Sequence, residues 1–516
     1  MNILRAPLPA DLTPLAAELG VTPLYGDIHN HCDLSYGHGR FEDALARAAL
    51  QLDFVSITGH AHWPDMPVDD PSVAHIVAFH VEGFARLRRR WPEHFAALQA
   101  ANGPRLVVFP GYEIHSGAYG DYTIVYRDLD PAPMILADSP AELAARLRAE
   151  MPERAFAFPH HIGYRPGARG VNWDVFDPTL SPFVEMNSMH GCAEASETDR
   201  PYLHSMGPVD GRQTMQAGLA RGKLFGVVGN TDHHSAFPGS YGHGRMAVYA
   251  HRRDRAAIWD AMLARRTNAL TGDSTHLLAA IGATMQGGVV APSRDATLRV
   301  EAVSGGFIDA IDVIRDGRLA HRVTPELTPA PISPRPLTTL YLEFGWGARG
   351  RSFRWEGEIG LDGGAILSVT PRFRGAEIVS PLEGEDGAHP LPSLATTTDG
   401  RVIFAVTAEA NPNNVTAATQ GLLLRCEAGD DARLRADLNG HRVELRLAEL
   451  FEAGRSGNLG PIDSPAWRIH AAPRPANWQW RGEIALGAIA AGETIYLRLR
   501  QRDGQRAWTS PFFVRG

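Results

Sequence analysis

Cysteine is scarce in this chain of 516 residues. The three cysteines, Cys32, Cys192 and Cys426, lie far apart and form no Cys-x-x-Cys pair. Disulfide frameworks and thiolate zinc sites both need several cysteines at short, regular spacings. The sequence therefore argues against both.

Long apolar runs and long runs of one charge are missing as well. No stretch reaches the roughly 18 apolar residues of a membrane-spanning helix, and the N-terminal segment lacks the apolar core of a signal peptide. The net charge of −8 argues mildly against a nucleic-acid partner, which would require a basic surface. We therefore expect a cytoplasmic protein that binds neither a membrane nor a nucleic acid.

The first half of the chain alternates between short apolar runs and segments with helical spacing. This alternation is typical of parallel βαβ units, and about seven strands suit a barrel better than a small open sheet. We expect this α/β barrel over residues 1–285. The expected strands are 24–28, 54–58, 106–109, 122–126, 155–158, 183–186 and 224–228, and the expected helices are 41–52, 73–101 with a break near Pro92, 140–150, 210–221 and 254–265.

The second half changes character at about Gln286, where the helical patterns fade and alternating apolar segments separated by turn residues begin. This pattern predicts an antiparallel, sandwich-like β domain over residues 286–516, in one or two modules. The expected strands are 297–303, 308–315, 352–359, 401–407, 421–426, 441–447 and 494–500. Its tryptophans favour core packing over a sugar-binding platform; they are Trp346, Trp355, Trp478, Trp480 and Trp508.

Histidines concentrate in the first half: sixteen of the 22 fall within residues 1–250. Several directly follow expected strands, and the active sites of such barrels collect at the carboxyl ends of the strands. In an extended segment residues i and i+2 point to one side, so His29 and His31 can bind one ion. The candidates at strand ends are His29, His31, His60, Glu113, His160, Asp232 and His234.

These residue types predict a metal centre with several ions. A carboxylate such as Glu113, placed just after an apolar strand, is costly unless it binds a cation or a strong donor. Imidazole and oxygen ligands without thiolate suit Zn, Mn or Fe. Clustered divalent ions about 3.5–4 Å apart lower the pKa of a bridging water and stabilise charge on the attacked centre. The predicted reaction is therefore a metal-dependent hydrolysis, and the β half is expected to supply no metal ligand.

The series of motifs resembles the PHP (polymerase and histidinol phosphatase) superfamily. It comprises His29-x-His31, Thr58-Gly59-His60, Glu113, His160 and Gly229-Asn-Thr-Asp-His-His234, where the family commonly has Gly-Ser-Asp-x-His. The resemblance covers about residues 22–275 and implies a distorted seven-stranded β/α barrel with two or three Mn, Fe or Zn ions. Residues 258–273, 311–317, 496–500 and 507–511 further resemble a bacterial branch of unknown function with a C-terminal β domain.

The resemblance also implies how the ligands are shared between ions. One ion would bind His29, His31, Glu113 and Asp232; a second would share Glu113 and take His160; a third would take His60 and His234, with His38 as an extra ligand. Besides binding metal, Asp232 or His234 could relay a proton.

Two departures from the family pattern leave alternatives open. The family often has a histidine between the glutamate and the strand-end histidine, and here Asp121 either replaces it or that ligand is missing. His38 lies seven residues after His31, which is a loose match. His160 and His161 are not separable by sequence; we favour His160 as the ligand and His161 as a supporting or substrate-contacting residue.

Further candidates depend on position alone. Glu185, Asn187 and His190 follow the strand 183–186 on the expected catalytic face, where salt bridges and capping are equally open roles. Arginines that follow metal motifs could clamp an anionic substrate, although solvated surface positions are commoner for arginine. They are Arg165, Arg169 and Arg245.

These observations favour a metal-dependent hydrolase, in particular a phosphoesterase that acts on a small, anionic or carbohydrate-like molecule. The phosphate comes from the resemblance alone, since fold does not fix substrate. Two alternatives stay open. The same metals could serve amide or ester hydrolysis or the elimination of a uronate-containing saccharide, or the site could be degenerate in a protein that only binds.

Overall fold

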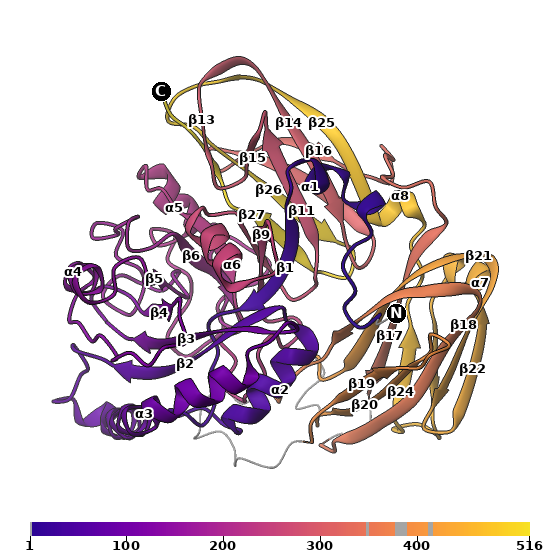
Figure 1. Cartoon of the computed structure of the whole chain (residues 1–516), viewed down its shortest axis with the longest axis horizontal. Coiled ribbons are helices and arrows are strands. Elements are labelled where there is room, and N and C mark those ends of the chain that lie inside the picture. Colours follow the sequence, from indigo (N-terminus) through magenta and orange to yellow (C-terminus); the bar gives the residue numbers. More distant parts are fainter. Residues whose placement is uncertain (1–2, 347–349, 377–389, 411–415) are drawn as a thin grey trace.

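The computed structural model describes residues 3–346, 350–376, 390–410 and 416–516. It shows a mixed α/β part built from the first half of the chain and a β-rich C-terminal region (Figure 1). No helix in these ranges combines the length and the apolar character needed to cross a membrane.

All seven strands expected in the first half are present. Their apolar residues are almost completely buried, which explains the continuous apolar runs in the sequence. They are β1 (Thr22–Asp27), β2 (Phe54–His62), β3 (Val107–Ile114), β4 (Tyr122–Tyr126), β5 (Ala155–Pro159), β6 (Phe183–Ser188) and β8 (Gly226–Gly229).

The alternation of strands and helices predicted parallel pairing between these strands, and this prediction is wrong for β3, β4 and β5. β1, β2 and β3 are parallel, whereas β3–β4 and β4–β5 are antiparallel. The segment between β3 and β4 is too short for the crossover that parallel neighbours need. β6 and β8 pair in parallel in a separate three-stranded sheet with β7 (Gly191–Cys192), and β5 packs beside β6. A closed barrel of seven strands stays a prediction.

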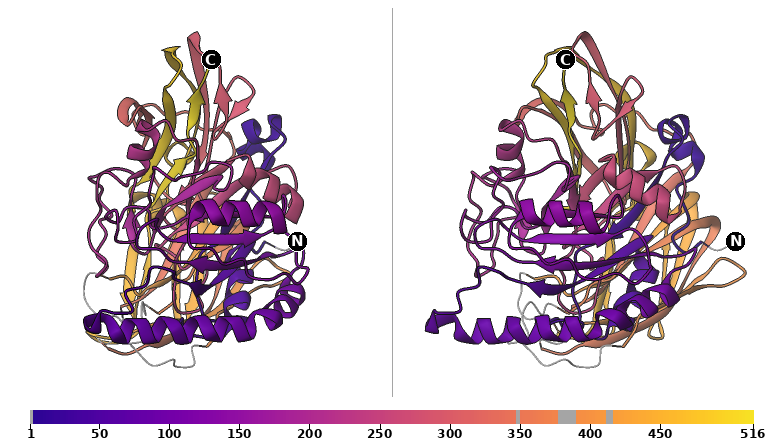
Figure 2. Two further views of the ribbon diagram at one scale, coloured as in Figure 1. Left: turned by 90° about the vertical axis from the view of Figure 1, so that its left-hand side faces the viewer. Right: turned by 60° about the vertical axis from the view of Figure 1, so that its left-hand side comes forward.

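Helices cover the α/β part, and α3 is the longest of them. It runs through Pro92 without the expected break, because a buried apolar stripe continues on both sides of the proline and packs on β2 and β3. Figure 2 shows α3 at the edge of the molecule opposite the C-terminus. The helices of the first half are η1 (Ala10–Leu12), α1 (Pro14–Glu18), α2 (Phe41–Gln51), η2 (Pro71–Val73), α3 (Ala74–Ala101), α4 (Pro140–Glu150), α5 (Met215–Ala220) and α6 (Arg255–Leu263). Two short helices, α7 (Leu447–Glu452) and α8 (Pro475–Trp478), belong to the C-terminal region.

The sheet of the α/β part continues into the C-terminal region. β1 pairs with β9, β9 with β10, and β10 with β27, so one 13-stranded sheet contains residues from both sides of position 285. The boundary at 285/286 stays a prediction. The strands that extend this sheet are β9 (Arg245–Ala250), β10 (Thr267–Leu270), β13 (Val289–Val290), β15 (Ile308–Arg315), β16 (Arg318–Val323), β26 (Thr494–Gln501), β27 (Arg506–Thr509) and β28 (Phe512–Val514).

A four-stranded sheet packs against this extension and forms a sandwich. Leu298 and Val300 of β14 share one apolar core with Val313 of β15 and Leu497 of β26. This agrees with the expected sandwich-like architecture. The four strands are β11 (His276–Ile281), β12 (Thr284–Met285), β14 (Ser293–Val303) and β25 (Gln479–Ile489).

A separate eight-stranded sheet forms the rest of the C-terminal region. Of the five tryptophans considered above, four are buried in apolar cores, as expected, whereas Trp346 is 45% exposed. The strands are β17 (Leu337–Gly345), β18 (Phe353–Arg372), β19 (Ser393–Thr396), β20 (Val402–Ala408), β21 (Gln420–Leu438), β22 (His441–Arg446), β23 (Arg455–Asn458) and β24 (Ala466–Ile469).

Candidate metal centre

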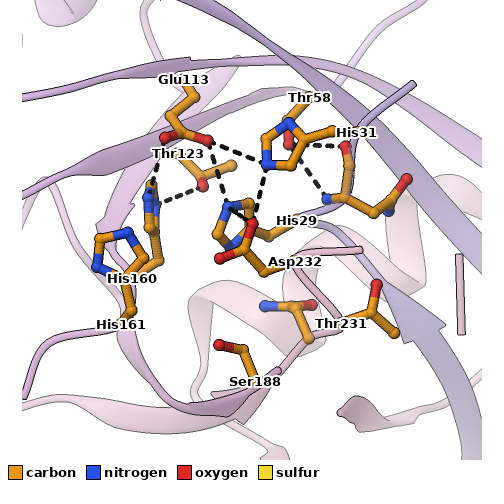
Figure 3. A network of polar contacts seen from close by, with 12 residues as sticks. His29, His31, Thr58, Glu113, Thr123, His160, His161, Ser188, Thr231 and Asp232 are labelled. Carbon is orange, nitrogen blue, oxygen red and sulfur yellow. Dashed lines mark hydrogen bonds and ion pairs between the residues drawn. The ribbon is translucent and has the colours of Figure 1, made fainter. Parts of the chain in front are cut away.

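A first group of ligand atoms lies where the segments after β1 and β8 meet (Figure 3). The amide of Asp232 donates to the carbonyl of His29 at 2.8 Å. The amide of His31 donates to the carbonyl of His233, also at 2.8 Å. Glu113 approaches from β3. Its Oε2 lies 3.3 Å from Nε2 of both His29 and His31, and Asp232 Oδ1 lies 3.3 and 3.0 Å from the same two nitrogens.

These spacings fit a divalent ion. Ligands about 2.0–2.1 Å from a tetrahedral ion lie about 3.3–3.4 Å from one another. His29 Nε2 and Glu113 Oε2 are buried and form no hydrogen bond of normal geometry with the described residues. Because unsatisfied buried polar atoms are costly, their convergence needs an explanation, and a cation between them supplies it.

A second group surrounds the other oxygen of Glu113. Oε1 lies 3.2 Å from His160 Nε2 and 3.3 Å from His115 Nδ1. Asp121 Oδ2 lies 3.3 Å from His161 Nε2 and 3.9 Å from His160 Nε2. The sheet order brings these residues together, since β4 lies between β3 and β5. The two oxygens of Glu113 thus face two separate groups, as in a bridging carboxylate.

A third grouping contains His31, His60 and His234, whose ligand atoms lie within 4.8 Å of one another. His60 reaches it because the register of β2 and β3 pairs it directly with Glu113. His38 is different. Its amide donates to the carbonyl of His234 at 2.7 Å, but no grouping among the described residues includes its ring.

Several of these histidines have one ring nitrogen held by a hydrogen-bonding partner, so that the other nitrogen faces the cluster. Such partners fix the tautomer and the orientation of a ligand ring. The pairs are His29 Nδ1 with Glu185 Oε2 at 2.8 Å, His60 Nδ1 with Ser35 Oγ at 2.9 Å, His160 Nδ1 with Thr123 Oγ1 at 2.9 Å, and His234 Nδ1 with the carbonyl of Asp232 at 2.9 Å.

Buried carboxylates make the cluster attractive to cations. Burial alone would raise the pKa of Glu113, but His160 and His60 hold it well below its ordinary value. Burial alone would lower the pKa of His29, yet Asp232 and Glu185 raise it well above its ordinary value. Negative charge therefore dominates around His29, and divalent ions are the species that hard and borderline ligands of this kind bind.

The backbone is strained at two members of the cluster. Asp232 has φ +54° and His161 has φ +30°, in the left-handed region that costs a non-glycine residue about 1–2 kcal/mol. Such strain concentrates at functional sites. The carboxylate of Asp27 holds the segment of Asp232 in place, because it accepts hydrogen bonds from the Thr231 hydroxyl at 2.5 Å and the Gly239 amide at 2.9 Å.

The weaker candidates after β6 separate into different positions. His190 Nε2 lies 2.8 Å from Asp232 Oδ2, at the edge of the cluster. Glu185 supports the cluster from behind, since it contacts His29 and accepts from the amide of His161 at 3.3 Å. Asn187 is directed away, and its amide donates to backbone carbonyls at 2.9 and 3.3 Å.

Of the three arginines, only Arg169 reaches the cluster. Its guanidinium contacts Asp121 Oδ2 and His115 Nδ1 and lies over the ring of Trp63. Arg165 is exposed. Arg245 is buried and donates to the Gly239 carbonyl and the Ser274 hydroxyl, so it holds the loop rather than facing the ligand atoms.

His115 is the member of the cluster that the sequence candidates omit. The signal was present, because His115 stands two residues after Glu113 at the end of an extended strand and therefore shares its side of the sheet. Within the described residues, every group of potential metal ligands comes from positions 29–234. That the β half supplies no metal ligand stays a prediction.

Comparison with known proteins gives loose likenesses. No protein-family model and no curated protein matches the sequence. Among solved structures, a two-domain protein from Bacteroides vulgatus containing a predicted PHP-like metal-dependent phosphoesterase shares 15% identity at a TM-score of 0.32, over 57% of this chain and 79% of that one. PsfC from Pseudomonas syringae shares 17% identity at a TM-score of 0.26, over 44% and 82%. The first description names the family that the motifs resemble, but likenesses this loose carry no argument about the site.

Proposed function

We propose that this chain is a metal-dependent hydrolase with a di- or trinuclear site and that it acts as a phosphoesterase on a small molecule. The observation that carries the proposal is the position of Glu113, whose two oxygens face two separate groups of buried imidazoles and carboxylates. Divalent ions at such a site supply a nucleophilic water at neutral pH and stabilise charge on the attacked centre.

The residues at the edge of the cluster favour an anionic substrate. The side chain of Arg169 is 17% exposed, and guanidinium groups bind phosphate and carboxylate oxygens strongly. His190, held against Asp232 and 5% exposed, is placed to move a proton to or from a bound substrate. The ligands are almost completely buried, which favours a small molecule. The choice of a phosphate ester over other anions is supported by the PHP resemblance of the motifs.

Metal analysis joined to a product screen tests the proposal. Purified full-length protein should contain at least two equivalents of Mn, Fe or Zn, and chelated protein reloaded with Mn²⁺ or Zn²⁺ should release phosphate from a phosphomonoester or phosphodiester. Protein that binds no metal would refute the hydrolase. A metal-loaded protein that releases only an amine, an alcohol from a carboxylic ester or an unsaturated sugar would refute the phosphoesterase.

A further inference from the structure

His115 presents Nδ1 to two carboxylates. Nδ1 lies 3.0 Å from Asp121 Oδ2 and 3.3 Å from Glu113 Oε1. If this nitrogen carries a proton, it can satisfy the carboxylates directly. If it carries a lone pair, three negative or electron-rich atoms converge, and a cation must lie between them. The bonds on the opposite side of the ring, together with the contact of Arg169 at Nδ1, decide between the two states.

A chain of hydrogen bonds from α3 fixes that opposite side. His80 Nδ1 lies 2.8 Å from the carbonyl of Ile76, which can only accept, so Nδ1 carries the proton. Burial lowers the pKa of His80 to about 3, so the ring is neutral and Nε2 is an acceptor. The hydroxyl of Tyr36, 3.3 Å away, donates to it. Because Tyr36 has one proton, its oxygen must accept from His115 Nε2, also 3.3 Å away.

The guanidinium of Arg169, which can only donate, contacts Nδ1 of His115. Nδ1 therefore accepts and holds the lone pair, and the single ring proton is on Nε2. We propose that Tyr36 and His80 are positioning residues that hold this lone pair toward a metal ion shared with Glu113 and Asp121. The inference rests on the proposed function, since it assigns a further ligand to the second ion. Among the described residues Arg169 supplies positive charge at this point, since its guanidinium contacts both His115 Nδ1 and Asp121 Oδ2, and a metal ion bound by these atoms would take the place of that contact.

The packing of α3 is adapted to this chain of bonds. The helix contains Gly83, and glycine costs a helix interior about 1 kcal/mol relative to alanine. A Cβ at this position would lie 2.6 Å from the ring of Tyr36. The same ring stacks on His60, with centroids 3.6 Å apart. Tyr36 is thus wedged between the helix and the cluster, and its hydroxyl has little freedom to choose other partners.

Zinc binding by the Tyr36→Phe variant tests the inference without an activity assay. Chelated full-length protein is titrated with Zn²⁺ against a competing chelator. Wild type should bind at least two equivalents. The variant should keep one tight site and bind the second ion about 10–100-fold more weakly, the usual effect of losing a partner that orients a ligand. Tyr126→Phe is the matched control, because that buried hydroxyl bonds to Tyr112 and Pro133.

A pair of variants at His80 separates the hydrogen bond from the packing. His80→Gln retains an acceptor for Tyr36 and should preserve most of the second affinity, whereas His80→Leu should lose it as Tyr36→Phe does. Equal zinc affinities in wild type, Tyr36→Phe and His80→Leu would overturn the inference while leaving the hydrolase intact. A wild type without zinc binding would instead overturn the proposed function.

Discussion

Trp508 Nε1 donates a 2.8 Å hydrogen bond to the carboxylate of Glu194, a residue 314 positions earlier in the chain. The same buried carboxylate accepts from the hydroxyl of Tyr496 at 2.7 Å and pairs with Arg498 at 3.2 Å. Glu194 follows β7 in the α/β part, whereas its three partners lie on β26 and β27. The C-terminal strands therefore complete the polar and apolar core behind the sheet that carries His190 and Asp232.

Glu113→Gln should abolish metal binding at more than one position. The amide retains the shape but loses the charge that faces both groups of ligands, so metal content and turnover should fall by more than the 10–100-fold expected for an outer partner. Elemental analysis and a phosphatase assay measure the two effects. Glu142→Gln on the exposed face of α4 is the control. Wild-type metal content in Glu113→Gln would rule out the bridging role.

Asp121→Ala should remove about one ion per chain. Asp121 Oδ2 lies within 3.9 Å of both His160 Nε2 and His161 Nε2, so its loss deprives the second group of a negative ligand while the first group is untouched. Metal stoichiometry after dialysis is the measurement. Asp138→Ala, whose carboxylate is 75% exposed, serves as the control. Unchanged stoichiometry in Asp121→Ala would mean that Asp121 is not a metal ligand and serves to hold Arg169 and the amide of Ser116.

The cluster was predictable from local sequence because each ligand type follows an apolar strand. A histidine or carboxylate at the carboxyl end of a buried strand joins those at the ends of neighbouring strands, and Asp232 joins them from β8 of the separate three-stranded sheet. His29, His160 and Asp232 were found in this way. His115 is not among these candidates, although it stands two residues after Glu113 and shares its side of the sheet. The contacts of Asn187 and Arg245 could not be predicted, since their partners lie in distant segments. Asn187 donates to backbone carbonyls, and Arg245 donates to the Gly239 carbonyl and the Ser274 hydroxyl.

The sheet topology was less accessible to sequence reasoning. The pairing of Ala269 on β10 with Trp508 on β27 joins strands that are far apart in the chain, and no local pattern specifies a partner at that distance. The sequence predicted a break in the helix at Pro92, since proline removes one backbone donor. Burial of Trp91 and Phe95 on either side of it outweighs that local cost, which is a tertiary effect.

Asp273 should stabilise the fold at neutral pH. Its carboxylate lies 2.9 Å from Arg372 of β18, and both side chains are buried. Burial alone would raise its pKa, but Arg372 holds it below the ordinary value of 3.8, so the stabilisation is present above that pH and is lost as the pH falls through the lower, folded value. Asp273→Asn should lower the free energy of unfolding by about 3–5 kcal/mol at pH 7, because it leaves the buried guanidinium with only the longer, 3.7 Å ion pair to Asp503.

Denaturant unfolding between pH 7 and pH 3 measures this effect. The gap between wild type and Asp273→Asn should be constant down to about pH 4 and then narrow, as the wild-type carboxyl takes up a proton. Asp431→Asn, at a side chain 98% exposed, should change stability by less than about 0.5 kcal/mol. A gap that is small at pH 7, or that widens in acid, would contradict the assigned role of the Asp273–Arg372 pair.

Truncation after Gly287 should yield an insoluble or unfolded fragment rather than an active α/β part. Val184, Met186 and Val227 of the sheet behind the metal centre share an apolar core with Tyr496 and Trp508, which the truncation removes. Each fully buried side chain of this size contributes about 1.5–3 kcal/mol, a large share of the 5–15 kcal/mol that typically stabilises a domain. The cut also removes the Ser510 hydroxyl, which accepts from the amide of Val227 at 2.9 Å.

Point substitutions in the full chain distinguish loss of this core from other effects of truncation. Trp508→Ala should destabilise the protein by about 3–5 kcal/mol and reduce metal retention, because β8 leads directly into the segment of Asp232. Trp346→Ala, at a side chain 45% exposed, should leave both unchanged. Thermal unfolding and metal content measure the outcome. A soluble, metal-loaded fragment ending at Gly287 would show that the α/β part needs none of the C-terminal strands.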